Sequence, residues 1–334
     1  MTEMEKNLKD LDDMLKNGML SPEDYRNMKA QITGSYTETP VTASTPAAAS
    51  TPVPPPVTPP PPPLMADDEK SYEGDLVNGV RHGKGKLTWT DGAVYEGGFV
   101  NGMRTGKGSY KYSDSEYSEV FEGEYFEDKR VRGKAVFTIS AGIETYEGEY
   151  KGRDFCGKGK YTYTNGNYYE GDWTDSVQNG KGKETMSDGS FYEGEWLNGK
   201  RHGKGKIVFA NGEHVEGSFA DGFVYNGKFM FSDGGFYDGD FYDSNYHGYG
   251  KEKIMNVGYY EGDFVNGKKT GKGIFRFDDG EVYDGYFLDN ALTGEGKLTK
   301  PDGTTMEGRF ENGKFIEGLM ITKEGTRINL TTKE

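Results

Sequence analysis

The segment YEGDLVNGVRHGKGKLTWTDGAV, residues 72–94, decides the fold, because altered copies of it recur along the rest of the chain. Successive copies are separated by 22 to 26 residues and begin at Tyr72, Tyr95, Phe121, Tyr146, Tyr169, Tyr192, Val215, Tyr237, Tyr260, Tyr283 and Met306. So regular a period predicts a stack of similar units, each of which is stable only against its neighbours.

Each unit is predicted to be a β-hairpin. A strand of type YEGxF is followed by a glycine-containing loop, a strand of type GKGxYxY and a second turn. Asn-Gly or Asp-Gly forms that second turn, and these dipeptides tolerate the positive φ angles of a type I′ hairpin turn. They lie at residues 91–92, 165–166, 188–189, 211–212, 233–234, 279–280 and 302–303. We therefore expect an all-β, elongated, solenoid-like antiparallel meander.

Alternation along the strands predicts two different faces, since residues two apart point the same way. Tyr95, Gly97 and Phe99 fall on one face, where aromatic rings are expected to stack in columns. The glycines leave room there for a neighbouring ring to lie over the backbone. The opposite face carries acidic first strands and basic second strands, such as Glu147 and Lys160, which predicts cross-strand ion pairs.

Two further segments precede the repeats. Residues 1–34 show helical periodicity and helix-capping signals, which predict a short helical hairpin that must associate with something to be stable. Residues 35–66 form a Thr-, Ala- and Pro-rich linker that contains PVPPPVTPPPPPL. This composition is typical of disorder and of the polyproline II conformation. This run is either a spacer or a ligand for the aromatic grooves of SH3, WW or profilin-like proteins. Residues 67–334 form the repeat region.

Composition excludes several functional classes. The net charge of −15 disfavours nucleic acid as a partner. Cys156 is the single cysteine, which excludes an intramolecular disulfide framework and a Cys-rich zinc site; we interpret it as a small buried residue rather than a reactive thiol. No apolar stretch reaches the length of a transmembrane segment, and no signal peptide is apparent, so we expect a cytoplasmic protein.

No residue constellation predicts catalysis, a metal site or a bound cofactor. His82, His202 and His247 occupy the same slot of different units, which indicates repeat architecture rather than an active site. Carboxylate pairs recur in nearly every unit, so none is singled out as a general acid or base. The GKG triplets lack the spacing of a phosphate-binding loop, and we interpret them as strand starts.

The pattern YEGxFxNGxxxGxGxxxxxDGxx resembles the membrane-occupation-and-recognition-nexus (MORN) repeat, with eleven copies over residues 72–325. The resemblance implies a non-enzymatic, often self-associating scaffold at membrane-associated cytoskeletal structures, and some members bind phosphoinositides. Departures from the pattern are Ala135 at an expected glycine, Val215 with a shortened loop, a missing loop glycine at residues 243–245, and Met306, which begins a terminal cap.

The N-terminal segment LKDLDDMLKNGMLSPEDYRNMKAQI is similar to the SHOCT domain, a helical hairpin implicated in oligomerisation. Its candidate oligomerisation residues are Leu8, Leu11, Leu15, Tyr25, Met28 and Ile32. This similarity implies that the chain can form a homo-oligomer.

Three functional hypotheses follow. The leading one is a scaffold or adaptor that binds protein partners, with a candidate partner surface of Tyr110, Tyr112, Tyr161, Tyr163, Trp173 and Trp196. The same rings could instead form stacking core. The alternative is an adaptor for phosphoinositides or other anionic lipids, with candidate contacts Lys200, Arg201, Lys204 and Lys206. A third is a regulatory partner of a separate enzyme, such as a phosphatidylinositol phosphate kinase.

Overall fold

The computed structural model describes residues 69–331. The predicted helical hairpin with its oligomerisation residues, and the linker, lie outside the described residues. Within residues 69–331 every regular element is a β-strand, which confirms the all-β prediction. The same residues contain no helix long and apolar enough to cross a membrane.

The described strands fall into two compact units, one ending at Ser244 and the other beginning at Asn245. The first contains β1 (Glu69–Val77), β2 (Val80–Trp89), β3 (Val94–Val100), β4 (Met103–Ser113), β5 (Ser118–Phe126), β6 (Lys129–Ile139), β7 (Gly142–Gly152), β8 (Asp154–Thr162), β9 (Tyr168–Thr174), β10 (Val177–Thr185), β11 (Phe191–Leu197), β12 (Lys200–Val208), β13 (His214–Ala220), β14 (Phe223–Met230) and β15 (Phe236–Tyr242). The second contains β16 (Asn245–Ile254), β17 (Gly258–Val265), β18 (Lys268–Phe277), β19 (Val282–Leu288), β20 (Ala291–Thr299), β21 (Thr305–Glu311), β22 (Lys314–Ile321) and β23 (Arg327–Thr331).

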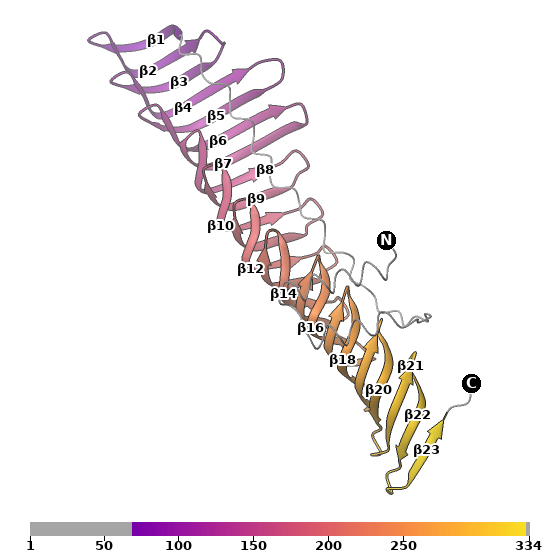
Figure 1. The fold of residues 1–334 in the computed structure, drawn as a ribbon. Coiled ribbons are helices and arrows are strands. Elements are labelled where there is room, and N and C mark those ends of the chain that lie inside the picture. The colour runs from indigo at the N-terminus through magenta and orange to yellow at the C-terminus, as the bar shows by residue number, and fades with distance from the viewer. Residues whose placement is uncertain (1–68, 332–334) are drawn as a thin grey trace, which may run out of the picture. The chain divides into compact units, whose positions relative to one another are not determined.

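Inside each unit, each strand pairs antiparallel with the strand that follows it in sequence, as Figure 1 shows. Each copy of the repeat supplies two strands, so repeat 1 forms β1 and β2, and repeat 11 forms β21 and β22. The predicted antiparallel meander is therefore confirmed within both units.

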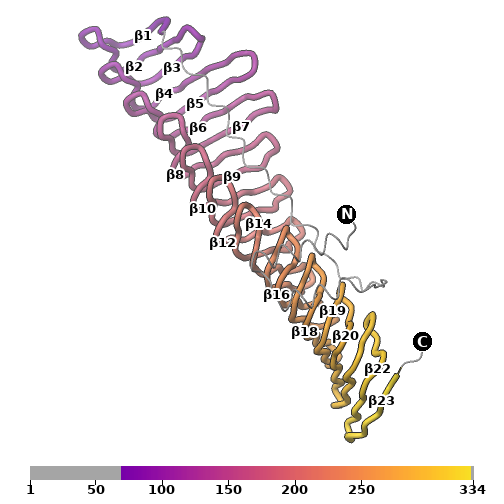
Figure 2. Tube along the Cα trace, in the orientation of Figure 1, coloured from indigo at the N-terminus to yellow at the C-terminus, as the bar shows by residue number. Residues whose placement is uncertain are grey.

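The turns at the two edges of the meander differ, and Figure 2 traces them as alternating loops. Between β1 and β2, Asn78 and Gly79 both have positive φ angles, 50° and 78°, as a type I′ turn requires. Non-glycine pairs form the same turn elsewhere, such as Glu127 and Asp128 with φ of 47° and 66°.

Our placement of type I′ turns at the Asp-Gly and Asn-Gly dipeptides was wrong. In the turn that follows β2, Gly92 alone has a positive φ, and its amide donates to Trp89 O over 3.1 Å while Trp89 N donates to Ala93 O over 3.0 Å. This pattern is a type I turn closed by a left-handed glycine. Asp91 has another role, because its Oδ1 accepts a hydrogen bond from the Ala93 amide over 2.8 Å.

A column of glycines crosses every strand of the first unit in register. Gly74 pairs with Gly85, Gly85 with Gly97 and Gly97 with Gly108, and the series continues to Gly239. In the second unit the same column runs from Gly250 to Gly318. A Cβ added at Gly182 would lie 2.2 Å from the hydroxyl oxygen of Tyr169. We call the repeats that begin with tyrosine standard repeats, and in them the tyrosine ring lies over the glycines of the same repeat. The predicted room for a neighbouring ring over these glycines is therefore confirmed, and the ring is the tyrosine of the same repeat.

The predicted aromatic columns form the core of the first unit. Tyr169 and Trp173 of one repeat contact edge-to-face with ring centroids 5.1 Å apart, and Tyr169 contacts Trp196 of the next repeat, also at 5.1 Å. Such edge-to-face pairs add about 0.5 to 1.5 kcal/mol each beyond the burial of their area. Because such contacts join one repeat to the next, they hold neighbouring hairpins together in place of a globular core.

Candidate functional site

The face opposite the aromatic core carries two lines of charge on either side of the glycine column. The central ladder joins residues in register on successive strands: Glu147, Lys160, Glu170, Lys183, Glu193 and Lys206. The bulge ladder lies on the other side of the glycines and contains Lys158, Asp172, Lys181, Glu195 and Lys204. Sign alternates from strand to strand along both ladders.

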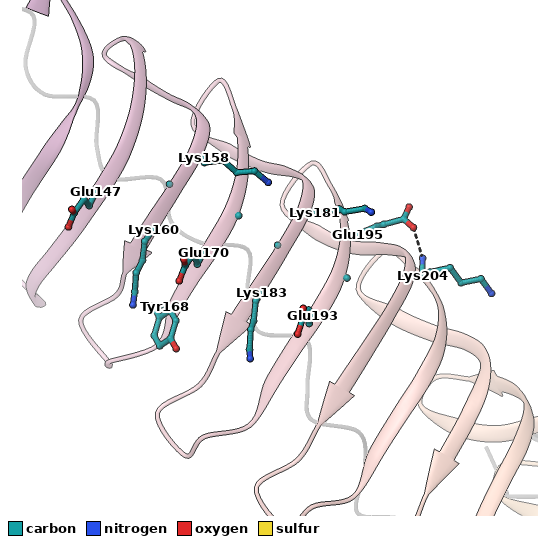
Figure 3. Close-up of a pocket in the computed structure, with 14 residues that line it drawn as sticks. Glu147, Lys158, Lys160, Tyr168, Glu170, Lys181, Lys183, Glu193, Glu195 and Lys204 are labelled. Carbon is teal, nitrogen blue, oxygen red and sulfur yellow. Dashed lines mark hydrogen bonds between the residues drawn. The ribbon is translucent and has the colours of Figure 1, made fainter. Parts of the chain in front are cut away.

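An open groove of about 1300 Å³ lies between the two ladders over repeats 4 to 6. Its floor is backbone at Gly159, Gly171, Gly182 and Gly194, and charged side chains form both sides. Figure 3 shows Lys158, Lys181 and Lys204 along one side of this floor and Lys160 and Lys183 along the other. Smaller grooves of the same construction lie over repeats 1 to 3 and over repeats 6 to 8.

The bulge ladder depends on an irregularity in the second strand of each standard repeat. In repeat 6, the register passes from Gly194 opposite Gly205 to Glu195 opposite His202, which leaves Gly203 and Lys204 as extra residues. Gly203 has a φ of 56°, and a Cβ there would meet Glu195 Oε2 at 2.4 Å, so this position requires glycine. Lys204 N donates to Glu195 Oε1 over 3.3 Å.

Our interpretation of the GKG triplets as strand starts was therefore wrong. They lie inside strands, where the first glycine forms the bulge and the second lies under the tyrosine ring. The bulge amide already has an anionic partner in several repeats, such as Lys181 N on Asp172 Oδ2 at 2.9 Å. The backbone amide that a bound phosphate would need therefore already donates its hydrogen bond to a carboxylate of the protein.

A tyrosine hydroxyl completes the standard repeat. Tyr169 donates to Asp172 O over 3.0 Å and Tyr192 to Glu195 O over 2.9 Å, and all eight tyrosine-led repeats share this bond to the carbonyl three residues on. Burial raises the pKa of Tyr95 to about 12, which keeps that hydroxyl protonated at neutral pH so that it can donate. These tyrosines are structural donors beneath the groove.

Most of the aromatic residues that we assigned to a partner surface are buried. Tyr110 is 2% exposed, Tyr161 1%, Trp173 4% and Trp196 5%, whereas Tyr112 and Tyr163 are half-buried. The indole N–H of Trp173 donates to Gly159 O over 3.0 Å, underneath the groove. The prediction of an exposed surface is wrong for the four buried rings, because single-layer hairpins use their aromatic residues to hold neighbouring repeats together.

The four candidate lipid contacts do not form one basic patch. Arg201 is 5% exposed, pairs with buried Glu184 at 3.1 Å and lies over the Tyr192 ring, so it belongs to the aromatic core. Lys200 pairs with Asp221 beside the turn, and Lys204 Nζ donates to Ser218 Oγ over 2.8 Å. Lys206 stands between Glu193 and Glu216 on the central ladder. The prediction fails for Arg201 because strand alternation turns it inward.

Cys156 and the histidines give no sign of catalytic chemistry. Cys156 is half-buried, and burial together with the charge of Glu149 raises the pKa of its thiol, which disfavours the reactive thiolate. Three histidines, His82, His202 and His247, each come directly after the residue that points into the aromatic core. They lie in the bulged part of the second strand. Repeat geometry accounts for their positions.

Sequence reasoning missed that repeats 3, 7 and 11 share one variant geometry. Their second strands have one extra residue at the bulge rather than two: Val131, Tyr225 and Ile316. Correspondingly, Ala135 does not replace a glycine, since it pairs with Phe121 while Gly133 occupies the glycine column. In these three repeats the sequence spacing from the type I′ turn to the column glycine is one residue shorter, and this spacing could have revealed the variant from the sequence.

The geometry defines a repeat protein of stacked β-hairpins. A family model, MORN repeat, matches residues 72–94, 95–117, 146–168, 169–191, 192–214, 237–254, 260–282 and 283–305, which is more than half of the chain. The chain belongs to the MORN-repeat family. The eight matched segments are the eight tyrosine-led repeats, and the other three of our eleven copies are the variant repeats. A search of the curated proteins finds no significant match to the chain.

Proposed function

We propose that this protein is a non-enzymatic scaffold that binds other proteins along the charged face of its repeats. The observation that carries this proposal is the groove, which has the same floor and the same alternating sides in repeats 4 to 6. A catalytic site needs one distinct constellation of groups, whereas this surface repeats one arrangement. MORN repeats are a non-catalytic module associated with protein and lipid binding, which supports the proposal.

The groove suits an extended or helical protein segment that carries both signs of charge. Adjacent strands lie about 4.8 Å apart, so a ligand running across them meets a change of sign at about that spacing. Weak contacts to several repeats add through effective concentration, which gives an extended surface useful affinity. We place this activity in the cytoplasm, at membrane-associated cytoskeletal structures.

Affinity capture with the full-length chain tests the proposal. In the Lys158→Glu/Lys181→Glu/Lys204→Glu variant, one side of the groove becomes uniformly acidic, and we expect recovery of groove-bound proteins to fall at least five-fold. The matched control, Lys129→Glu/Lys268→Glu/Lys314→Glu, changes the same number of charges beside type I′ turns. Equal recovery of every captured protein by the groove variant and the unmodified chain would contradict the proposal.

Anionic lipid is the alternative ligand, and exposed Lys200 and Lys204 are the residues that favour it. The alternation of sign and the burial of Arg201 weaken it, because a membrane surface attracts clustered positive charge. Sedimentation with phosphoinositide vesicles across a salt series decides between the two ligands. Salt-sensitive pelleting that Lys200→Glu/Lys204→Glu abolishes would replace the scaffold proposal with the lipid one.

A further inference from the structure

A half-buried, mostly apolar column runs beside the central ladder on the charged face of repeats 5 to 8. In register from strand to strand, it consists of Tyr168, Thr185, Phe191, Val208, His214, Met230 and Phe236. We name it the side column. An aromatic ring recurs on every second strand, because Tyr168, Phe191, His214 and Phe236 each begin the first strand of a repeat.

The side column differs from the same positions in the first repeats. There the corresponding residues on first strands are Ser71, Val94, Val120 and Thr145. Hairpin formation therefore does not require an aromatic ring at this position. The rings in repeats 5 to 8 form a surface feature that folding alone does not explain.

Lysines of the central ladder lie against these rings. Lys160 Nζ is 3.8 Å from the ring centroid of Tyr168, and Lys183 Nζ is 3.8 Å from that of Phe191. Lys228 continues this ladder beyond Lys206 and Glu216, and its Nζ lies 4.2 Å from the ring centroid of Phe236. These three positions thus combine an apolar surface with a cationic hydrogen-bond donor beside it.

The spacing of the rings matches one ligand conformation. Two strand separations of about 4.8 Å place successive rings about 9.6 Å apart. A polyproline II helix has three residues per turn and a rise of about 3.1 Å, which repeats its side chains every 9.3 Å or so. Its backbone has no internal hydrogen bonds, so its carbonyls can accept bonds from the adjacent ammonium groups.

The chain contains a segment of that composition. Residues 52–64, PVPPPVTPPPPPL, would extend for about 40 Å as polyproline II, whereas the rings from Tyr168 to Phe236 span about 29 Å. We propose that the side column binds residues 52–64 of a second copy of this chain. This inference does not rest on the proposed groove ligand, because it is argued from the rings, although the side column borders the groove, and Tyr168 with the adjacent Lys160 and Lys183 also lines it.

The length of the connection favours a second copy over the same chain. Residues 64 and 69 are five positions apart in the sequence, which spans at most about 18 Å. Strand β9, which begins with Tyr168, lies eight strand separations from β1, or about 38 Å along the sheet. Only the first half of the proline run could reach Tyr168 within one chain, whereas a second copy can supply the whole run.

A titration followed by fluorescence anisotropy tests the proposal, with a labelled peptide of residues 51–64 as the probe. The receiving protein is the full-length chain with Pro55, Pro56, Pro60 and Pro61 replaced by Ser, so that its own run does not compete. We expect Tyr168→Ser/Phe191→Ser to weaken peptide binding at least five-fold. The matched control, Val94→Ser/Val120→Ser at the same repeat position, should change it less than two-fold.

Serine or threonine already occupies this position at Ser71 and Thr145, so the variants are expected to fold, and their thermal unfolding checks this. Absence of peptide binding, or equal binding to both double variants, would overturn the side column as the site. Light scattering of the full-length chain tests the second copy: its concentration-dependent mass should fall in the proline variant and in Tyr168→Ser/Phe191→Ser. Peptide binding with an unchanged mass would replace the second copy with docking inside one chain.

Discussion

Repeats 5 and 7 show how a small change in one hairpin alters several linked features. Repeat 5 begins with Tyr169, whose hydroxyl donates to Asp172 O, and its second strand carries a bulge with left-handed Gly180. Repeat 7 begins with Val215, which has no hydroxyl, and Tyr225 is its single extra residue. Repeats 3 and 11, which begin with Phe121 and Met306, resemble repeat 7 in both respects.

The two-residue bulge and the leading tyrosine therefore occur together in the same repeats. In a standard repeat the two-residue bulge of the second strand occurs together with a tyrosine whose hydroxyl donates to a carbonyl beside that bulge, and a buried hydroxyl without an acceptor costs about 1 to 3 kcal/mol. Where the bulge is shorter, an apolar residue removes that requirement. The glycine column is the part that both kinds of repeat keep, because the two strands approach closely there in either case.

The substitution with the largest expected effect is at the core-facing position after the type I′ turn, where repeats 3 and 7 differ. Arg130 occupies it in repeat 3 and pairs with fully buried Glu119, whereas repeat 7 has Val224 there. Arg130→Val should destabilise the chain by about 3 to 5 kcal/mol, since it leaves a buried carboxylate unpaired. Urea unfolding measures the loss, and Arg130→Val/Glu119→Leu should recover most of it. A loss below about 1 kcal/mol for the single change would contradict the buried pair.

The glycine column gives the next largest effect. A Cβ at Gly182 would meet three atoms of the Tyr169 side chain within 2.4 Å, so Gly182→Ala should cost about 1 to 3 kcal/mol. Removing the ring with Tyr169→Ala should relieve much of that cost in the double variant, as a double-mutant cycle in thermal unfolding would show. In repeat 7 a Cβ at Gly227 meets backbone atoms instead, so Val215→Ala should not relieve Gly227→Ala. Equal relief in both repeats would show that the ring is not the obstacle.

Exchanging the hydroxyl tests the link between tyrosine and bulge. Tyr169→Phe should cost about 1 kcal/mol through loss of one hydrogen bond. Phe121→Tyr should also destabilise, because repeat 3 has the shorter bulge. When a glycine is inserted between Val131 and Arg132, the Phe121→Tyr change should become stabilising relative to the insertion alone. If Phe121→Tyr stabilises without the insertion, the bulge and the hydroxyl are independent.

The smallest expected effect is a pH dependence confined to repeats with an acidic bulge partner. Burial acts to raise the pKa of Asp172, but hydrogen bonds from the Lys158 ammonium and the Lys181 amide outweigh it and lower the pKa. The resulting stabilisation is present above the unfolded-state pKa of about 3.9 and is lost as pH falls below it through the lower folded-state value. Asp172→Asn should remove a few tenths of a kcal/mol at pH 7 and nothing near pH 2. Ser218→Asn, at the matching site of repeat 7, should change stability equally at both pH values.

Much of the fold could be predicted from sequence because the repeat constrains register. A period near 23 residues, alternating Tyr and Phe, and Asn-Gly pairs are sufficient to indicate hairpins, two unlike faces and an aromatic core. The turn types at the two edges could not be assigned, because Asp-Gly suits both a type I′ turn and a type I turn with a following left-handed glycine.

Much less of the candidate site could be predicted. Arg201 resembles a surface cation in the run KRHGKGK, although Phe155, Gln178 and Val224 occupy the same inward position in other repeats and could have indicated burial. The groove was missed because glycines were considered only for the ring that they accommodate on the aromatic face. The opposite side of the same glycines is an uncovered strip of backbone, and this is visible only when all strands are placed in register.

Lysine footprinting shows directly whether protein partners bind along the charged face. The full-length chain is acylated alone and in complex with a captured protein partner, and the modification of each lysine is measured by mass spectrometry. If partners bind in the groove, Lys158, Lys181 and Lys204 should be protected at least five-fold in the complex, with Lys129 and Lys268 beside the type I′ turns unchanged. Protection at the turn lysines, with the groove lysines fully reactive, would contradict binding in the groove.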